Sequence, residues 1–184
     1  DDIRAKDINC MFADKNIKGI FALRGGYGCA RLLNLIDFKL IKKNPKIFVG
    51  YSDITALHIA INQKSKLVTY HGPMISTELI KGLDEYTASY YKKFIFGNDK
   101  VEEIYNPEGY NLESINTGIS SGQLIGGNLS LICSSLGTKY EINTKNKILF
   151  LEEVEEPPYK IDRMLTQLKQ SGKLKDVNGI VLGT

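Results

Sequence analysis

Residues 46–58 read KIFVGYSDITALH, and this stretch predicts a strand that turns directly into a helix. The apolar run ends at Gly50, and a helical pattern of apolar residues begins just after Asp53. Gly50 has no side chain where the strand and the helix nearly collide, as in the sharp turns that expose a nucleophilic serine in hydrolases. Ser52 lies at the tip of this turn, although Ile54 replaces the second glycine of that hydrolase motif.

The turn has two competing interpretations. Ser52 or Asp53 can cap the helix by accepting hydrogen bonds from its first amides. Alternatively, the Ser52 hydroxyl is exposed at the carboxyl edge of a sheet, where ligands of open α/β sheets bind. The Asp53 amide then points into the same space and can donate to an oxyanion. The pattern of residues around the turn leaves both interpretations open.

Strand-like and helix-like segments alternate along the first half of the chain. Apolar runs at 18–24, 46–50 and 67–73 predict strands. Helical patterns predict a helix with Ile8, Met11 and Phe12 on one face, a helix over 29–41 with Leu32, Leu33, Leu35 and Ile36 inward, and a helix over 54–64. This alternation favours a parallel sheet with right-handed crossovers.

The character of the sequence changes after about residue 97. Residues 97–122 are polar and rich in turn-forming residues, which indicates either two short strands with loops or a linker. Beyond them the patterns predict a turn into a helix over 123–137, a strand over 147–154, a helix over 159–172 and a last strand over 178–184. We therefore expect two domains, residues 1–105 and residues 106–184.

The composition argues against several classes of protein. The chain has 184 residues, 42% of them hydrophobic and 24% charged, which is ordinary for a soluble globular protein. The net charge of +3 is spread without a basic block, so nucleic acid is a poor candidate partner. No apolar stretch approaches the roughly 18 residues of a membrane span. Cys10, Cys29 and Cys133 fit buried thiols better than disulfides or a metal site.

Two glycine-rich turns are further candidates for a ligand site. RGGYG, residues 24–28, follows a predicted strand and opens a predicted helix, where backbone N–H groups can bind an anion. A tight turn that needs glycine dihedrals explains the same residues equally well. GGN, residues 126–128, precedes another helix, and Asn128 either faces a ligand or caps that helix.

A nucleophilic serine also needs a base, normally a histidine held by a carboxylate. His58 lies six residues after Ser52 on nearly the opposite side of the helix, which predicts a core or surface position. His71 ends a predicted strand at the same sheet edge, where it either lines the site or bonds to its own turn. The acidic run LEEVEE ends another strand, and alternation turns Glu152 and Glu153 to opposite faces. Either one carboxylate faces a site or the run is a solvated turn.

Taken together, these segments resemble the LD-carboxypeptidase family, the serine peptidases that include murein tetrapeptide carboxypeptidase and the microcin-immunity hydrolases. The segments that carry the resemblance, in the family's order, are FALRGGYGCARLL, PKIFVGYSDITALH, TYHGPM, GQLIGGNLSLI, ILFLEEVEEPPYKIDRMLTQL and GIVLGT. The resemblance implies an α/β fold with a parallel sheet and flanking helices, flavodoxin-like in its N-terminal part, and a smaller mixed α/β C-terminal domain. It also implies a cytoplasmic homodimer in peptidoglycan recycling, with a murein peptide substrate, no cofactor or metal, and neither nucleic acid nor membrane as partner.

The resemblance assigns roles to individual residues. Ser52 matches the nucleophile of the family. Glu152 matches the acidic member of its Ser-His-Glu triad. The amide of Asp53 and a backbone amide of Gly25 or Gly26 match the oxyanion hole.

The family's triad histidine lies downstream of the GIVLGT segment, and neither His58 nor His71 matches it. The chain also begins within a helical pattern and closes on an apolar run, so we expect a fragment of a longer protein. Without its histidine, Ser52 has no base and its attack slows by several powers of ten. We therefore expect these 184 residues alone to be inactive.

The implied parent activity is removal of the terminal D-alanine from a murein tetrapeptide through an acyl-enzyme. Arg24 is a candidate to bind the substrate carboxylate, or else it pairs with a carboxylate of the protein. His71 and Asn128 are further candidates for substrate binding. The alternatives are a microcin-type hydrolase of peptidyl adenylates, a non-catalytic anion binder built on the two glycine turns, and a homologue in which Ser52 is purely structural.

Overall fold

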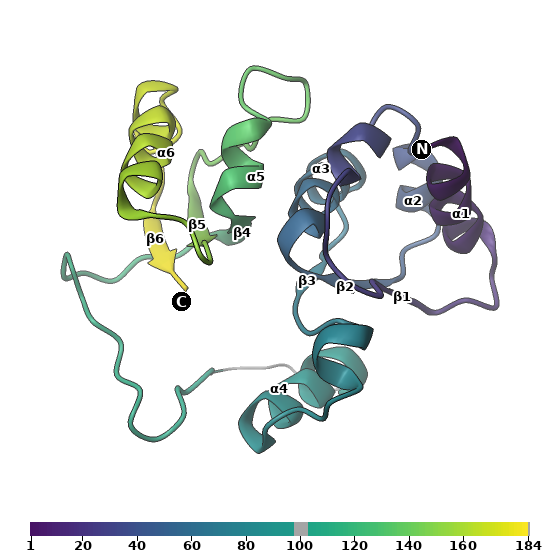
Figure 1. The fold of residues 1–184 in the computed structure, drawn as a ribbon, viewed down its shortest axis with the longest axis horizontal. Helices are drawn as coiled ribbons and strands as arrows, with labels where there is room; N and C mark the ends of the chain where they lie inside the picture. Colours follow the sequence, from purple (N-terminus) through teal and green to yellow (C-terminus); the bar gives the residue numbers. More distant parts are fainter. Residues whose placement is uncertain (98–102, 184) are drawn as a thin grey trace.

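Figure 1 shows the computed structural model of the protein, which describes residues 1–97 and 103–183. In these residues, two three-stranded sheets have the strand orders β1-β2-β3 and β4-β5-β6. Neighbouring strands in both sheets run parallel, as a strand-helix alternation predicts. The α/β class with parallel strands and flanking helices is therefore confirmed.

The first sheet and its helices come from the N-terminal half. The elements are α1 (Asp2–Ala13), β1 (Gly19–Phe21), a 3₁₀ turn η1 (Cys29–Leu32), α2 (Phe38–Lys43), β2 (Ile47–Gly50), a 3₁₀ turn η2 (Ser52–Ile54), α3 (Thr55–Ser65), β3 (Tyr70–His71), a π-helical turn η3 (Ile75–Leu79) and α4 (Glu85–Phe96). The sequence patterns predicted the three strands, α1 and α3, but not α4.

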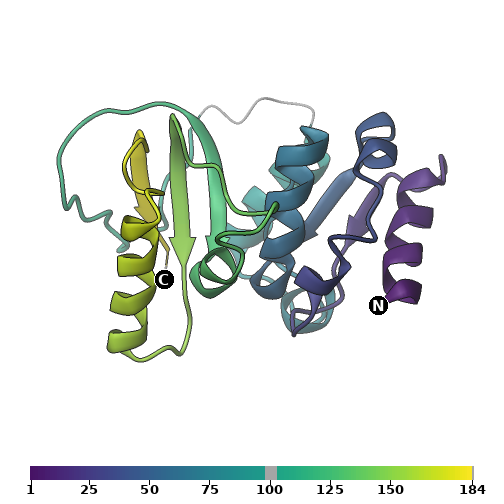
Figure 2. The ribbon, with the colours of Figure 1, turned by 90° about the horizontal axis from the view of Figure 1, so that it is seen from above.

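The second sheet follows later in the chain. Its elements are β4 (Gln123–Asn128), α5 (Leu129–Ser134), β5 (Lys147–Glu152), α6 (Pro158–Gln170) and β6 (Gly179–Leu182). Figures 1 and 2 place α5 and α6 against the same face of this sheet, and Ile132, Leu149 and Leu168 belong to the hydrophobic core between them. None of the helices in the described part of the chain combines the length and the apolar character needed to cross a bilayer.

The predicted helix over 29–41 is wrong as one continuous element. It divides into η1 and α2, because the Asp37 side chain accepts hydrogen bonds from the amides of Lys39 and Leu40 and so starts a new helix. The chain between η1 and α2 turns Leu35 outward, so Leu35 is 41% exposed and does not face the core as predicted.

The predicted turn at the start of 123–137 is also wrong, because Gln123–Asn128 is a strand that pairs with β5 along its whole length. Gly126 and Gly127 adopt φ values of +148° and +134°, which glycine tolerates inside a strand. A Cβ at Gly126 would lie 1.7 Å from the Phe150 carbonyl oxygen. The glycines that suggested a turn instead allow two backbones to come close.

Residues 103–122 contain neither helix nor strand, so the linker interpretation fits this part. The other part of the predicted linker, residues 98–102, lies outside the described residues. The division into domains 1–105 and 106–184 stays a prediction.

The cysteines follow the prediction only in part. All three are free, and Cys29 and Cys133 are buried, but Cys10 is exposed. Cys10 is turned away from the core because Ala5 and Phe12 form the buried side of α1. Among the described residues, no group of three or more potential metal ligands is found.

Helix α3 packs in both halves of the protein. Ala56, Leu57 and Ala60 belong to the core of the first sheet, whereas Ile59 belongs to the core of the second. The Thr55 hydroxyl accepts a hydrogen bond of 3.0 Å from the amide of Asn128 at the end of β4. Helix α3 therefore fixes the end of β4 relative to the turn that contains Ser52.

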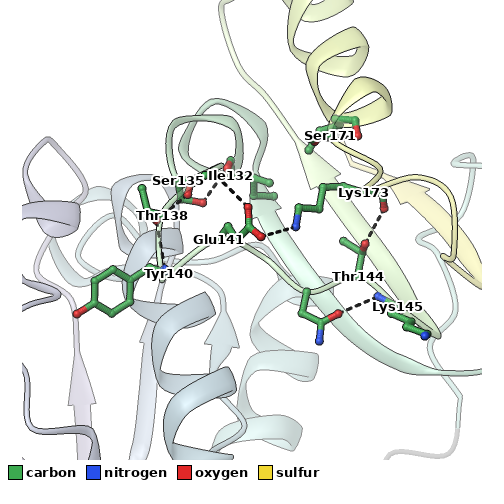
Figure 3. A network of polar contacts seen from close by, with 12 residues as sticks. Ile132, Ser135, Thr138, Tyr140, Glu141, Thr144, Lys145, Ser171 and Lys173 are labelled. Carbon is green, nitrogen blue, oxygen red and sulfur yellow. Dashed lines mark hydrogen bonds and ion pairs between the residues drawn. The ribbon is translucent and has the colours of Figure 1, made fainter.

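A polar network holds the loop between α5 and β5 (Figure 3). Glu141 Oε1 lies 3.0 Å from Lys173 Nζ, and the Thr144 hydroxyl donates to the Lys173 carbonyl at 2.6 Å. The Tyr140 hydroxyl donates to the Leu33 carbonyl at 2.7 Å, across to the N-terminal half. The loop thus provides a second connection between the two halves, in addition to the packing of α3.

We predict that Gly126→Ala lowers the free energy of unfolding by about 3 kcal/mol or more, because the added Cβ overlaps the Phe150 carbonyl and must separate β4 from β5. Gly137→Ala is the control: Gly137 also has a positive φ, of +78°, but has open space around it, so the loss should be about 1 kcal/mol. Urea unfolding measures both, and equal losses would show that the close contact does not matter.

Candidate active site

The turn between β2 and α3 is shaped by a close contact at Gly50. A Cβ at Gly50 would lie 2.9 Å from Ile54 Cγ1 and 3.0 Å from Ala22 Cβ, so only glycine fits. The side chain of Ile54 therefore packs directly over the end of β2. Ser52 follows with φ +61°, a left-handed conformation that is costly for serine and is often found at functional sites.

Neither Ser52 nor Asp53 caps helix α3, so the capping interpretation is wrong for both. The Ser52 hydroxyl makes no hydrogen bond within residues 1–97 and 103–183, and the N-terminus of α3 has no side-chain cap. Ser52 instead lies against the RGGYG turn, since a Cβ at Gly25 would be 3.2 Å from Ser52 Cβ and 3.3 Å from Ser52 Oγ. The fold thus brings the two predicted turns into contact.

The Asp53 side chain connects the two turns. Asp53 is 5% exposed, and its Oδ2 accepts a hydrogen bond of 2.9 Å from the amide of Cys29, which directly follows the RGGYG turn. In the described part of the chain, the amides of Gly25, Gly26 and Asp53 donate no hydrogen bond. These amides are therefore available to an acceptor beside Ser52.

His58 is a core residue, one of the two positions predicted for it. Its Nε2 lies 2.8 Å from the Gly50 carbonyl, which also accepts a bond from the Gly72 amide. Burial lowers the pKa of His58 to about 4, so the ring is neutral at pH 7 and donates through Nε2. His58 thus supports the end of β2 through its hydrogen bond to the Gly50 carbonyl.

His71 and Glu152 meet at the carboxyl ends of β3 and β5. His71 Nε2 lies 3.9 Å from Glu152 Oε1, and the two side chains are 27% and 12% exposed. Burial lowers the pKa of His71, whereas burial and the neighbouring charge of Glu153 raise that of Glu152. The ring of His71 also contacts those of Phe150 and Tyr51, at centroid distances of 5.3 Å and 5.9 Å.

Glu152 and Glu153 point in different directions, as strand alternation predicted. Glu153 accepts hydrogen bonds from Asn128 Nδ2 and from the Ser130 amide, so it supports the N-terminus of α5. Glu152 Oε1 is buried and finds no hydrogen-bond partner among the described residues. A buried carboxylate oxygen without a donor is costly, and such groups are often functional.

Of the predicted substrate-binding residues, Asn128 is held by hydrogen bonds to its own helix, whereas Arg24 is exposed. The Asn128 side chain accepts bonds from the Leu131 amide and the Ser130 hydroxyl, so it caps α5, the structural alternative predicted for it. Arg24 is exposed and forms no ion pair within the described residues. Its guanidinium lies beside the RGGYG turn, with Nη1 3.5 Å from the place of a Cβ at Gly26.

Glu78 is a residue of this region that the sequence analysis missed. Its Oε1 accepts a hydrogen bond of 2.6 Å from the hydroxyl of Tyr51, the residue before Ser52. Glu78 belongs to the π-helical turn η3, and no periodic pattern predicts such a turn. The one available signal was its position shortly after the TYHGPM segment.

Two models of one protein family match most of the chain. Residues 1–72 match the model of the LD-carboxypeptidase N-terminal domain, and residues 121–184 match that of the LD-carboxypeptidase C-terminal domain. A probable murein peptide carboxypeptidase from Bacillus subtilis (strain 168) is 48% identical over 185 residues, which cover 99% of this chain and 56% of that protein.

Two solved structures share the fold of this chain. The muramoyltetrapeptide carboxypeptidase from Oxalobacter formigenes superimposes with a TM-score of 0.84 at 33% identity, covering 100% of this chain and 60% of that one. The microcin C7 self-immunity protein MccF in complex with aspartyl sulfamoyl adenosine gives 0.81 at 26% identity, covering 98% and 62%. The chain thus spans less than two thirds of the length of these relatives.

We predict that the buried His58 makes the protein less stable in acid. Its pKa is about 4 in the folded state against an ordinary 6.5, so the unfolded state binds more protons between these values. The stability associated with neutral His58 is full above pH 6.5 and falls as the pH drops toward 4, by about 2 kcal/mol between pH 7 and pH 5.

Urea unfolding of the wild type and of His58→Gln at both pH values measures this effect. Glutamine retains an N–H donor for the Gly50 carbonyl but does not titrate, so its loss of stability between pH 7 and pH 5 should be smaller by that amount. Parallel losses in the two proteins would contradict the assignment.

Proposed function

This chain belongs to the LD-carboxypeptidase family, and we propose that it is the greater part of a serine carboxypeptidase that removes the terminal D-alanine from a murein tetrapeptide. The main support is the contact of Ser52, in its strained turn, with the RGGYG turn beside the amide of Asp53. The relatives named as carboxypeptidases support a peptidase. We extend the proposal to a cytoplasmic homodimer that acts in peptidoglycan recycling, for which family membership is the support.

The proposed chemistry is acyl transfer. Ser52 Oγ attacks the carbonyl carbon of the bond to the terminal D-alanine, and its proton passes to a base. The amides of Asp53 and of Gly25 or Gly26 donate to the oxyanion of the tetrahedral intermediate. The intermediate collapses, the base returns the proton to the leaving amine, and water then hydrolyses the acyl-enzyme.

We propose that the base is a histidine from outside these 184 residues and that Glu152 orients it. The buried Glu152 Oε1 has no donor among the described residues, which suits an acceptor for an imidazole N–H. Burial raises the pKa of Glu152, so a cationic partner next to it would also relieve the cost of its charge.

His71 is the alternative base within the chain. It lies 3.9 Å from Glu152 Oε1 and is only partly exposed, so a neutral imidazole already adjoins the carboxylate. Its ring lies 5.9 Å from that of Tyr51, the residue before Ser52, between centroids and at an interplanar angle of 48°. We nevertheless favour the external histidine, because His71 does not match the triad histidine of the family.

A microcin-type hydrolase of peptidyl adenylates is the second candidate function. The similarity to the MccF structure with aspartyl sulfamoyl adenosine favours it. Against it, the sequence has no tryptophan to stack on a nucleobase. Turnover of a murein tetrapeptide and of a peptidyl adenylate by the full-length protein, compared side by side, distinguishes the two.

We predict that Ser52→Ala lowers D-alanine release from murein tetrapeptide by the full-length protein by about 10⁴-fold or more, because the nucleophile is lost. A fluorophosphonate probe should label Ser52 in the wild type, as peptide mapping by mass spectrometry can show. Failure to label Ser52 would favour a non-catalytic anion binder. If the 184 residues alone turn over the substrate and Ser52→Ala abolishes that turnover, His71 is identified as the base.

We predict that Gly25→Ala slows D-alanine release by about 100-fold, because the methyl group displaces Ser52 and crowds the proposed oxyanion hole. Gly118→Ala is the matched control, since a Cβ at Gly118 meets nothing within 4 Å and should leave kcat unchanged. An active Gly25→Ala protein would place the oxyanion donors elsewhere.

A further inference from the structure

The carboxylate of Glu78 collects three hydrogen bonds at one point of the structure. Oε1 accepts from the Tyr51 hydroxyl at 2.6 Å. Oε2 accepts from the Met74 amide at 2.9 Å and from the Thr77 hydroxyl at 2.6 Å. Burial alone would raise the pKa of Glu78, but the bonds from Thr77, Tyr51 and the Met74 amide lower it, so the group is a carboxylate at pH 7.

One side of this cluster reaches the turn that contains Ser52. Tyr51 directly precedes Ser52, whose φ of +61° persists only if the surrounding structure holds it. The backbone of Tyr51 is extended, with φ −150° and ψ −171°, and its hydroxyl reaches Glu78 in η3. A short bond from a hydroxyl to a carboxylate is among the stronger hydrogen bonds of proteins. Glu78 thus fixes the residue before the proposed nucleophile.

The other side of the cluster reaches the RGGYG turn. The amides of Ile75 and Ser76 donate to the carbonyls of Ala22 and Leu23, and the Ser76 hydroxyl also donates to Leu23 at 2.8 Å. These carbonyls lie just before the RGGYG turn. Residues 74–78 therefore hold the approach to that turn by main-chain bonds.

Met74 adds a packing contact at the same place. Its side chain is buried, and its Cε lies 3.6 Å from the place of a Cβ at Gly25. Because the Met74 amide donates to Glu78 Oε2, the carboxylate fixes the backbone from which this side chain extends. Residues 74–78 thus contact both turns. Glu78 bonds to Tyr51, next to Ser52, and to Met74, which packs beside Gly25.

We propose that Glu78 is a positioning residue that, through Tyr51 and Met74, keeps Ser52 and the RGGYG turn in the geometry needed for attack. The proposal rests on the proposed role of Ser52 as nucleophile. It also explains the π-helical turn, since an extra residue in a helical turn re-aims its side chains and such turns are frequent at functional sites.

The test compares Tyr51→Phe, Glu78→Ala and Glu78→Gln in the full-length protein. Tyr51→Phe removes one hydroxyl, and Glu78→Ala removes all three bonds. We expect kcat for D-alanine release to fall by about 10-fold and about 100-fold, with KM changed less than threefold, because a displaced nucleophile affects the chemical step. Labelling of Ser52 by a fluorophosphonate should slow in proportion.

Glu78→Gln separates positioning from charge. Its amide oxygen can accept from the Met74 amide, and its NH₂ group can donate to the Tyr51 oxygen, so the bonds survive without the charge. We expect it to regain most of the activity lost in Glu78→Ala. A Glu78→Gln protein as slow as Glu78→Ala would show that the charge itself matters and would overturn the positioning role.

A control and a fallback complete the test. Glu108→Ala removes a carboxylate at an exposed position of the segment 103–122 and should leave kcat and labelling unchanged. If Glu78→Ala does not fold, Tyr51→Phe alone decides. Labelling of Ser52 in the wild type, with the same rate in Tyr51→Phe and Glu78→Ala as in the wild type, would overturn the role of Glu78 and leave the proposed function intact. Absence of labelling in the wild type would overturn both.

Discussion

The packing of Ile54 and Ala22 against the bare Cα of Gly50 is the constraint on which the site depends. Because no side chain separates β2 from the start of α3, the chain must reverse within Tyr51, Ser52 and Asp53. That reversal places Ser52 in a left-handed conformation at the carboxyl edge of the sheet. The amide of Asp53 then has no helical partner, and its carboxylate is free to hold the amide of Cys29.

The same turn begins α3, and α3 determines how the two sheets meet. Thr55 binds the end of β4, and Ile59 packs into the second core. Glu152, at the end of β5, is thereby brought next to His71 at the end of β3. The proposed site thus draws on strands of both sheets, although the last strand of the first sheet ends at His71 and the first strand of the second begins only at Gln123.

Sequence patterns predicted those features that depend on neighbours in the chain. Gly50, Ser52 and the run of apolar residues before them predicted the strand and turn. The patterns failed where contacts between distant segments decide the conformation. The glycines of β4 looked like a turn because nothing local reveals the carbonyl of Phe150. No local pattern revealed the bond between Glu78 and Tyr51, because the two lie 27 residues apart. Leu35 faced outward because the cap at Asp37 divided its helix.

The packing of α3 has a consequence for how the protein loses its fold. Residues from this one helix belong to both hydrophobic cores, so neither sheet can open while the other keeps all of its contacts. The two halves are then expected to behave as a single cooperative unit in hydrogen exchange, with the amides of α3 among the slowest. Heat should accordingly unfold the protein in one transition, without a partly folded species that retains the serine turn.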